Sequence, residues 1–93
     1  MRIEFRKSFE KSIKRLKSEE KGGIHQTCQT LVAVIENQQK SFEGLGLKKL
    51  DKIYWEIRAS LKLRIIFEWQ DDLIKFILVG SHDEIKTFLK ENV

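Results

Sequence analysis

The chain has 93 residues, of which 41% are hydrophobic and 34% charged, and this composition fits one small folded domain rather than an apolar-poor disordered chain. Its single cysteine excludes an intrachain disulfide, and no apolar stretch reaches the roughly 20 residues of a membrane span. The polar start of the chain also lacks the apolar segment of a signal peptide. We therefore expect one domain over residues 1–93 in a complete cytoplasmic chain.

The net charge of +4 is unevenly distributed. Residues 1–21 carry eight Lys/Arg against four acids and residues 48–70 carry six against three, whereas residues 22–47 carry one against two. A sequence pI near 9.3 with clustered basic residues indicates affinity for a polyanion such as nucleic acid. The alternative, that lysines only keep a small protein soluble, remains open.

The first elements are a strand and two helices. Residues 2–5 alternate polar and apolar, which predicts a short strand. Apolar residues at helical spacing from Ser8 predict a helix that ends at Gly22-Gly23, and a second helix follows. The apolar face of the second helix is formed by Ile24, Cys28, Leu31, Val32 and Ile35. We interpret Cys28 as a small buried hydrophobic residue and His25 as a surface residue.

The second half of the chain has the pattern of strands. Residues 53–58 and 62–69 each alternate an apolar with a charged face, and residues 59–61 are short enough for a tight hairpin. Residues 73–79 are apolar apart from Lys75, which predicts an interior strand. A final helix starts after Gly80, where Ser81 and Glu84 form a capping-box pattern. The order β-α-α-β-β-β-α predicts an α+β domain with helices packed on one face of a mostly antiparallel four-stranded sheet.

Polar side chains should converge on one face of this sheet. A turn at residues 59–61 places Arg58 near Lys62 and Glu56 near Arg64, and the next turn brings Arg64 opposite about Leu78. His82, just beyond that strand, then lies near the same cations. Crowded cations on an open sheet face favour binding of an anion, and a helix start favours a phosphate. The alternative is that the cations are solvated or paired with Glu56 and Glu68.

Other chemistries have little support in the sequence. One cysteine and two distant histidines give no zinc-binding spacing, and neither a glycine-rich phosphate loop nor a serine elbow is present. We expect no metal and no cofactor.

Four segments of the chain resemble the RelE/ParE superfamily of toxins, with the RelE-type translational repressors as the most similar branch. The segments are Leu47-Lys48-Lys49-Leu50, Tyr54-Trp55-Glu56-Ile57-Arg58, Leu63-Arg64-Ile65-Ile66-Phe67 and Val79-Gly80-Ser81-His82-Asp83-Glu84. The resemblance implies a RelE-like fold and a ribosome-dependent endoribonuclease that cleaves mRNA without a metal. It also implies a cognate antitoxin as partner, besides the ribosome and mRNA, and no membrane.

The resemblance further implies roles for individual residues. Arg64 would stabilise charge on the scissile phosphate, His82 would act as general acid, and Arg58 and Glu56 lie where relatives carry basic or acidic site residues. Lys86 occupies a position that is commonly aromatic in the family, often tyrosine, so it either replaces that residue in catalysis or leaves catalysis weak. RNA contacts are expected from six lysines: Lys11, Lys14, Lys17, Lys48, Lys49 and Lys62. Two alternatives remain open: a ParE-like toxin that binds DNA gyrase, and a catalytically weak homologue kept for complex formation.

Overall fold

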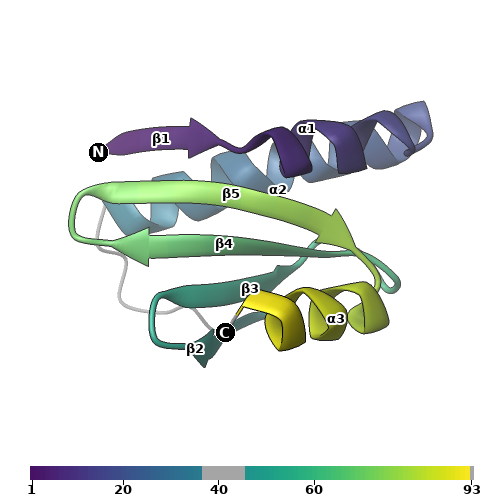
Figure 1. Ribbon diagram of the computed structural model, residues 1–93. Coiled ribbons are helices and arrows are strands. Elements are labelled where there is room, and N and C mark those ends of the chain that lie inside the picture. Colours follow the sequence, from purple (N-terminus) through teal and green to yellow (C-terminus); the bar gives the residue numbers. More distant parts are fainter. Residues whose placement is uncertain (37–45, 93) are drawn as a thin grey trace.

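The computed structural model describes residues 1–36 and 46–92, which form five strands and three helices. In chain order these are β1 (Arg2–Phe5), α1 (Lys7–Lys14), α2 (Ser18–Glu36), β2 (Leu47–Asp51), β3 (Tyr54–Arg58), β4 (Arg64–Gln70), β5 (Leu73–Gly80) and α3 (His82–Asn92). The strands form one sheet in the order β1-β5-β4-β3-β2 (Figure 1). Only the β1–β5 pair is parallel, so the predicted mostly antiparallel α+β fold is confirmed.

The sheet has five strands rather than the predicted four. The additional strand, β2, is the short segment Leu47–Asp51 at one margin, paired antiparallel with β3. Its sequence lacks the usual alternation of polar and apolar residues, because the adjacent Lys48 and Lys49 place one charged side chain on each face of the sheet. An edge strand tolerates this because it is less buried than the central strands. Lys49 lies with its ammonium 5.8 Å from the centre of the Trp55 ring, a cation–π contact that substitutes for apolar packing.

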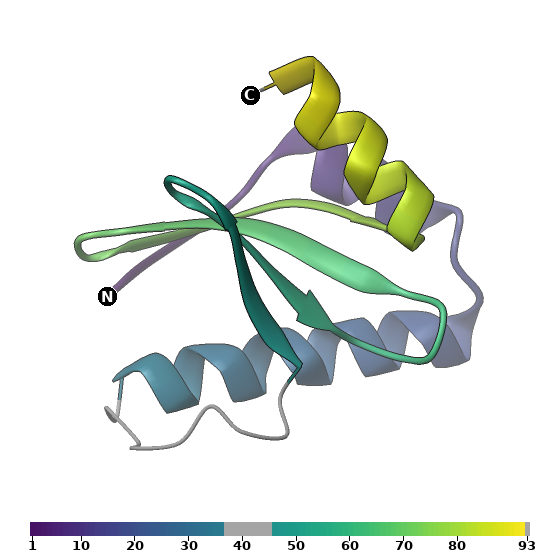
Figure 2. The ribbon, with the colours of Figure 1, turned by 90° about the horizontal axis from the view of Figure 1, so that it is seen from below.

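The helices cover both faces of the sheet, and the prediction that they lie on one face is wrong. Figure 2 shows α2 along one side of the sheet and α3 on the other. On the α2 side, Ile65 and Phe67 pack with Ile24 and Leu31. On the α3 side, residues from the sheet and α3 form a second, smaller core: Ile66, Ile77 and Ile85, with Leu50, Tyr54, Leu78, Phe88 and Leu89 packed against them. Ile66 lies between Arg64 and Glu68 on its face of β4, and together with Ile77 of β5 it forms the buried surface under α3.

The boundary between α1 and α2 lies earlier than predicted. Helix α1 ends at Lys14, and Gly22 and Gly23 lie inside α2 rather than between two helices. Before α2, the Glu20 carboxylate accepts a hydrogen bond from the Lys17 backbone N–H at 2.9 Å, which stabilises the new helix start. The glycines are tolerated there because the apolar face of α2 is held by its packing on the sheet.

Helix α1 continues the hydrogen bonding of β1 along β5. Strand β1 pairs with residues 73–76 of β5, and the Arg6 N–H donates to the Phe76 carbonyl. Beyond that point the Ser8 hydroxyl donates to the Ile77 carbonyl at 2.5 Å, and the Val79 N–H donates to the Ser12 hydroxyl at 3.0 Å. Two side chains of α1 thus form hydrogen bonds with backbone groups of β5 that lie beyond the end of its pairing with β1.

Candidate functional site

The two arginines predicted for chemistry lie directly opposite each other on neighbouring strands. The register of β3 and β4 pairs Arg58 with Arg64, and that of β4 and β5 pairs Arg64 with Gly80. The predicted partner of Arg58 was Lys62, but the β3–β4 loop spans residues 59–63 and not 59–61. The Ala59 and Ser60 N–H groups both donate to the Leu63 carbonyl, so Lys62 lies exposed in the loop.

Glu56 is the acidic residue of this cluster. It lies on the same face of β3 as Arg58, because alternate residues of a strand share a face. Its Oε2 is 3.5 Å from Nε of Arg64, and the two side chains are only 12% and 17% exposed. The predicted proximity of Glu56 and Arg64 is therefore found, although Ile66 rather than Arg64 is the register partner of Glu56.

The start of α3 lies at the same end of the sheet as the arginine pair. His82 is the first residue of α3, two positions beyond Gly80, the register partner of Arg64. His82 and Lys86, one turn further along the helix, are both exposed. The capping box forms as predicted: the Ser81 N–H donates to Glu84 at 3.0 Å and the Glu84 N–H donates to the Ser81 hydroxyl at 3.2 Å.

Glu84 links this helix start to α1. Its carboxylate also accepts a hydrogen bond from the Arg15 guanidinium at 3.3 Å. The hydrogen bond from the Ser81 backbone is the largest cause that lowers the pKa of Glu84. Burial opposes it, and the Ser81 hydroxyl and Arg15 lower the pKa by smaller amounts. The carboxylate thus stays charged beside the amide groups at the helix start, where it competes with any incoming anion.

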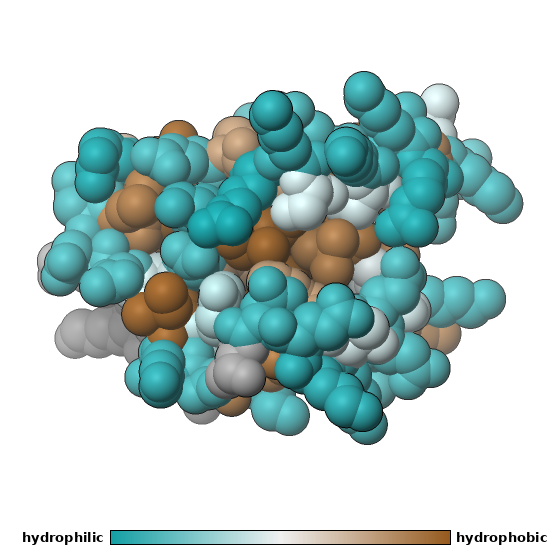
Figure 3. Space-filling view, viewed as in Figure 1, coloured by the Kyte–Doolittle hydropathy of each residue, from teal (hydrophilic) through white to brown (hydrophobic). Residues whose placement is uncertain are grey.

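The predicted RNA-binding lysines do not form one patch. Lys48 is the register partner of Glu56 and lies on the face of the arginine pair, whereas Lys49 lies on the opposite face over Trp55. Of the other four, Lys62 lies exposed in the β3–β4 loop, and three lie exposed at α1 and the connection that follows it: Lys11, Lys14 and Lys17. Hydrophilic side chains cover most of the face that carries α3, with hydrophobic atoms visible towards its centre (Figure 3).

The aromatic residue near Lys86 is not available to the site. Phe88 packs edge-on against Tyr54 with ring centroids 5.7 Å apart, and it belongs to the smaller core under α3. Lys86, for which the family resemblance implied a nearby aromatic residue, is itself exposed.

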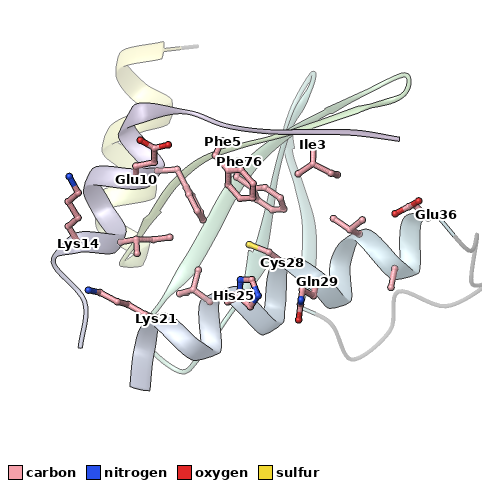
Figure 4. A pocket seen from close by; sticks show the side chains of 15 residues that line it. Ile3, Phe5, Glu10, Lys14, Lys21, His25, Cys28, Gln29, Glu36 and Phe76 are labelled. Atoms are coloured by element: carbon pink, nitrogen blue, oxygen red, sulfur yellow. The ribbon is translucent and has the colours of Figure 1, made fainter. Parts of the chain in front are cut away.

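A separate apolar groove lies on the other side of the molecule, between β1, α1 and α2 (Figure 4). It has a volume of about 820 Å³. Phe5, which is 51% exposed, and Cys28 both line it. Burial raises the pKa of the Cys28 thiol to about 12, in agreement with the predicted role as a packed hydrophobic residue. His25 lines the groove too, but no titratable residue of the arginine cluster does.

The described residues contain no group of three or more His, Cys, Asp or Glu side chains that could hold a metal ion. No helix within residues 1–36 or 46–92 is long and apolar enough to cross a membrane.

The element order and sheet topology define a small α+β domain with the fold of the RelE/ParE-like toxins. Among solved structures the chain is similar to YafQ from E. coli strain BL21(DE3), with 19% identity, a TM-score of 0.68, and coverage of 91% of this chain and 98% of that one. It is similar to the chain in the RelB-RelE antitoxin-toxin complex from Methanococcus jannaschii, with 22% identity, a TM-score of 0.65, and coverage of 91% and 96%. It is also similar to YoeB from Staphylococcus aureus, with 20% identity, a TM-score of 0.65, and coverage of 88% and 97%.

No protein-family model matches the chain, and no curated protein matches it. The comparisons with solved structures therefore establish the fold, and the resemblance to the RelE/ParE superfamily noted in the sequence is confirmed at that level.

Proposed function

We propose that the chain is the toxin of a type II toxin–antitoxin system and acts as a ribosome-dependent endoribonuclease on mRNA. The observation that carries this proposal is the cross-strand pair of Arg58 and Arg64 beside the start of α3. Like charges directly opposite each other in a sheet destabilise it, and Glu56 can neutralise only one of the two. A phosphodiester placed between the arginines would relieve the repulsion.

The proposed reaction is attack of an RNA 2′-hydroxyl on the adjacent phosphate. The new bond closes a 2′,3′-cyclic phosphate, and the bond to the 5′ oxygen of the next nucleotide breaks. Arg64 and Arg58 stabilise the negative charge that develops on the phosphate oxygens, an effect worth about 3 kcal/mol per well-placed donor. His82 donates the proton that the leaving 5′ oxygen needs, and general acid–base help of this kind contributes about 10²–10⁴-fold.

Glu56 is proposed to hold Arg64 in place and to accept the proton of the 2′-hydroxyl. Its position 3.5 Å from Arg64 supports the first role directly. The second role requires one carboxylate oxygen to turn from Arg64 towards the substrate. Lys86 is proposed as a further cation beside the phosphate, in place of the aromatic residue of relatives.

The proposed partner is a cognate antitoxin. The similar structures include antitoxin–toxin complexes of YafQ with DinJ and of RelE with RelB. An acidic amphipathic segment would neutralise the arginine cluster, and to displace α3 it would have to replace the burial of Ile85, which is 1% exposed. Co-purification of this chain with the product of a neighbouring gene tests the partner.

In vitro translation with and without the protein, followed by mapping of message ends, tests the activity. Cleavage should be lost in Arg64→Ala and His82→Ala and retained in Lys90→Ala, an exposed cation in the last turn of α3 to which the proposed mechanism assigns no contact. Unchanged cleavage in both site variants would remove the mechanism.

A supercoiling assay with DNA gyrase tests the alternative function, that of a gyrase-binding toxin. Inhibition of DNA gyrase supercoiling with intact mRNA would identify a gyrase-binding toxin instead. A soluble protein that binds an antitoxin but neither cleaves mRNA nor inhibits gyrase would be a catalytically weak homologue. Two observations favour this alternative: Lys86 has no hydroxyl, and Phe88 is packed against Tyr54.

A further inference from the structure

The arginine pair is flanked on both sides by glycine. Four residues form one row across the sheet: Gly46, Arg58, Arg64 and Gly80. Leu47 pairs with Ile57, so Gly46 lies opposite Arg58 in the same antiparallel ladder, and the Arg58 N–H donates to the Gly46 carbonyl at 3.2 Å. Gly80 completes the row as the register partner of Arg64.

Gly46 has no room for a side chain. Its φ of +69° lies in the left-handed region, which residues with a side chain rarely adopt. A Cβ at this position would lie 2.9 Å from Cβ of Arg58 and 3.5 Å from its backbone nitrogen. Contacts below 3.0 Å essentially do not occur, so either Arg58 or the start of β2 would have to move.

The two glycines inside α2 provide a comparison. Apart from the adjacent residues and the backbone of the helix itself, no atom lies within 4 Å of the position that a Cβ would take at Gly22 or Gly23, and neither glycine has a left-handed φ. The steric constraint at Gly46 therefore comes from its closeness to Arg58, and the two glycines of α2 do not share it.

Resting on the proposed function, we propose that Gly46 is a positioning residue that fixes Arg58 beside Arg64 for phosphate binding. The side chain of Arg58 starts at the Cβ that a side chain at position 46 would overlap, and the Arg58 N–H is hydrogen-bonded to the Gly46 carbonyl. A displaced Cβ carries the guanidinium with it, and a misplacement of about 1 Å in a catalytic constellation can cost about 10²-fold in rate.

The test compares Gly46→Ala with Gly22→Ala in the translation-coupled cleavage assay. Gly46→Ala should lower the cleavage rate at saturating ribosome concentration at least tenfold with a smaller change in KM, whereas Gly22→Ala should cleave like the wild type. Equal rates for the two variants would overturn the proposal. If Gly46→Ala does not fold, Gly46→Asn takes its place, because asparagine tolerates the left-handed region but keeps the contact with Arg58. Failure of both variants to fold would make the role of Gly46 structural and the proposal wrong.

A double-mutant cycle separates positioning from a general loss of stability. In an Arg58→Ala background the clash at Gly46 persists but there is no guanidinium to misplace, so adding Gly46→Ala should cause no further loss of cleavage. A further loss as large as in the wild-type background would contradict the proposal.

An NMR measurement is independent of the proposed function. Gly46→Ala should shift the Arg58 amide and Nε–H resonances while those of residues 73–76 stay in place. Unmoved Arg58 resonances in a folded variant would overturn the positioning role. Full cleavage by Arg58→Ala, with shifted resonances in Gly46→Ala, would instead reject the function proposed for Arg58.

Discussion

Glu56 and Arg64 form an ion pair that is almost covered, with 3.5 Å between Oε2 and Nε and side-chain exposures of 12% and 17%. The pair of Glu84 and Arg15 is shorter, at 3.3 Å, but its side chains are 46% and 66% exposed. Water screens the exposed pair far more strongly, so the longer contact should matter more to stability.

Glu56→Gln should therefore lower the free energy of unfolding by about 1–3 kcal/mol, because it leaves the guanidinium of Arg64 largely covered without a counter-charge. Arg15→Ala should lower it by less than about 1 kcal/mol. Urea unfolding of both variants measures the difference. Equal losses would mean that the Glu56–Arg64 pair is as well solvated as the exposed one.

Alanine at either glycine of α2 should stabilise the protein. Gly22 and Gly23 have helical neighbours on both sides and open space where a Cβ would lie. Because glycine in a helix interior costs about 0.5–1 kcal/mol relative to alanine, each substitution should raise the free energy of unfolding by that amount. Thermal unfolding checks this, with Gly46→Ala as the opposite case, since strain there should lower the midpoint.

The capping box at α3 should make stability depend on acid. The pKa of Glu84 is lowered from its ordinary value of 4.5, chiefly by the hydrogen bond from the Ser81 backbone. A carboxyl whose pKa is lower in the folded state stabilises that state above the ordinary pKa, and the contribution is lost as the pH falls below it. Glu84→Gln should therefore flatten the decline in stability below about pH 4.5. Urea midpoints between pH 3 and pH 7 measure the slope, and an unchanged slope would exclude Glu84 as its source.

The Cys28 thiol should resist alkylation until the protein unfolds. Its pKa is raised to about 12 by burial, from an ordinary value of 9.0. At pH 8 the folded protein should react at least 100-fold more slowly than the urea-unfolded chain, because the thiolate is the reactive form. The same shift should reduce stability as the pH rises above about 9, since the unfolded state then loses the thiol proton first. Comparable alkylation rates in water and urea would contradict the burial of this residue.

The register around the arginines shows how far the sequence could lead. Alternation correctly assigned Glu56, Arg58 and Arg64 to one face, because period-2 patterning is local information. The identity of the residue opposite Arg58 depended on the length of the β3–β4 loop. The Leu63 N–H donates to the Ser60 hydroxyl at 3.1 Å and helps to close this five-residue loop, but the amino-acid composition of the loop gives no clear sign of that hydrogen bond.

The helices show where tertiary contacts prevail over local signals. Gly22-Gly23 favours a break, yet burial of Ile24 and Leu31 against the sheet outweighs the helix-forming cost of two glycines. Ile66 and the apolar run of residues 73–79 both indicated that the face opposite α2 is covered, since apolar residues on that face need a covering element. Strand β2 had no such indication, because both of its central lysines are exposed.

The serine hydroxyls of α1 bear on how far strand β5 is open to pairing with another chain. A β-strand whose backbone groups are unpaired is a template for intermolecular aggregation, and β5 leaves the cover of β1 after Phe76. Ser8 and Ser12 occupy the carbonyl of Ile77 and the amide of Val79 from a helix that cannot itself template a cross-β stack. Replacing both serines with alanine would remove the partners of these two backbone groups on the most apolar strand of the sheet, which should favour pairing of β5 with another chain.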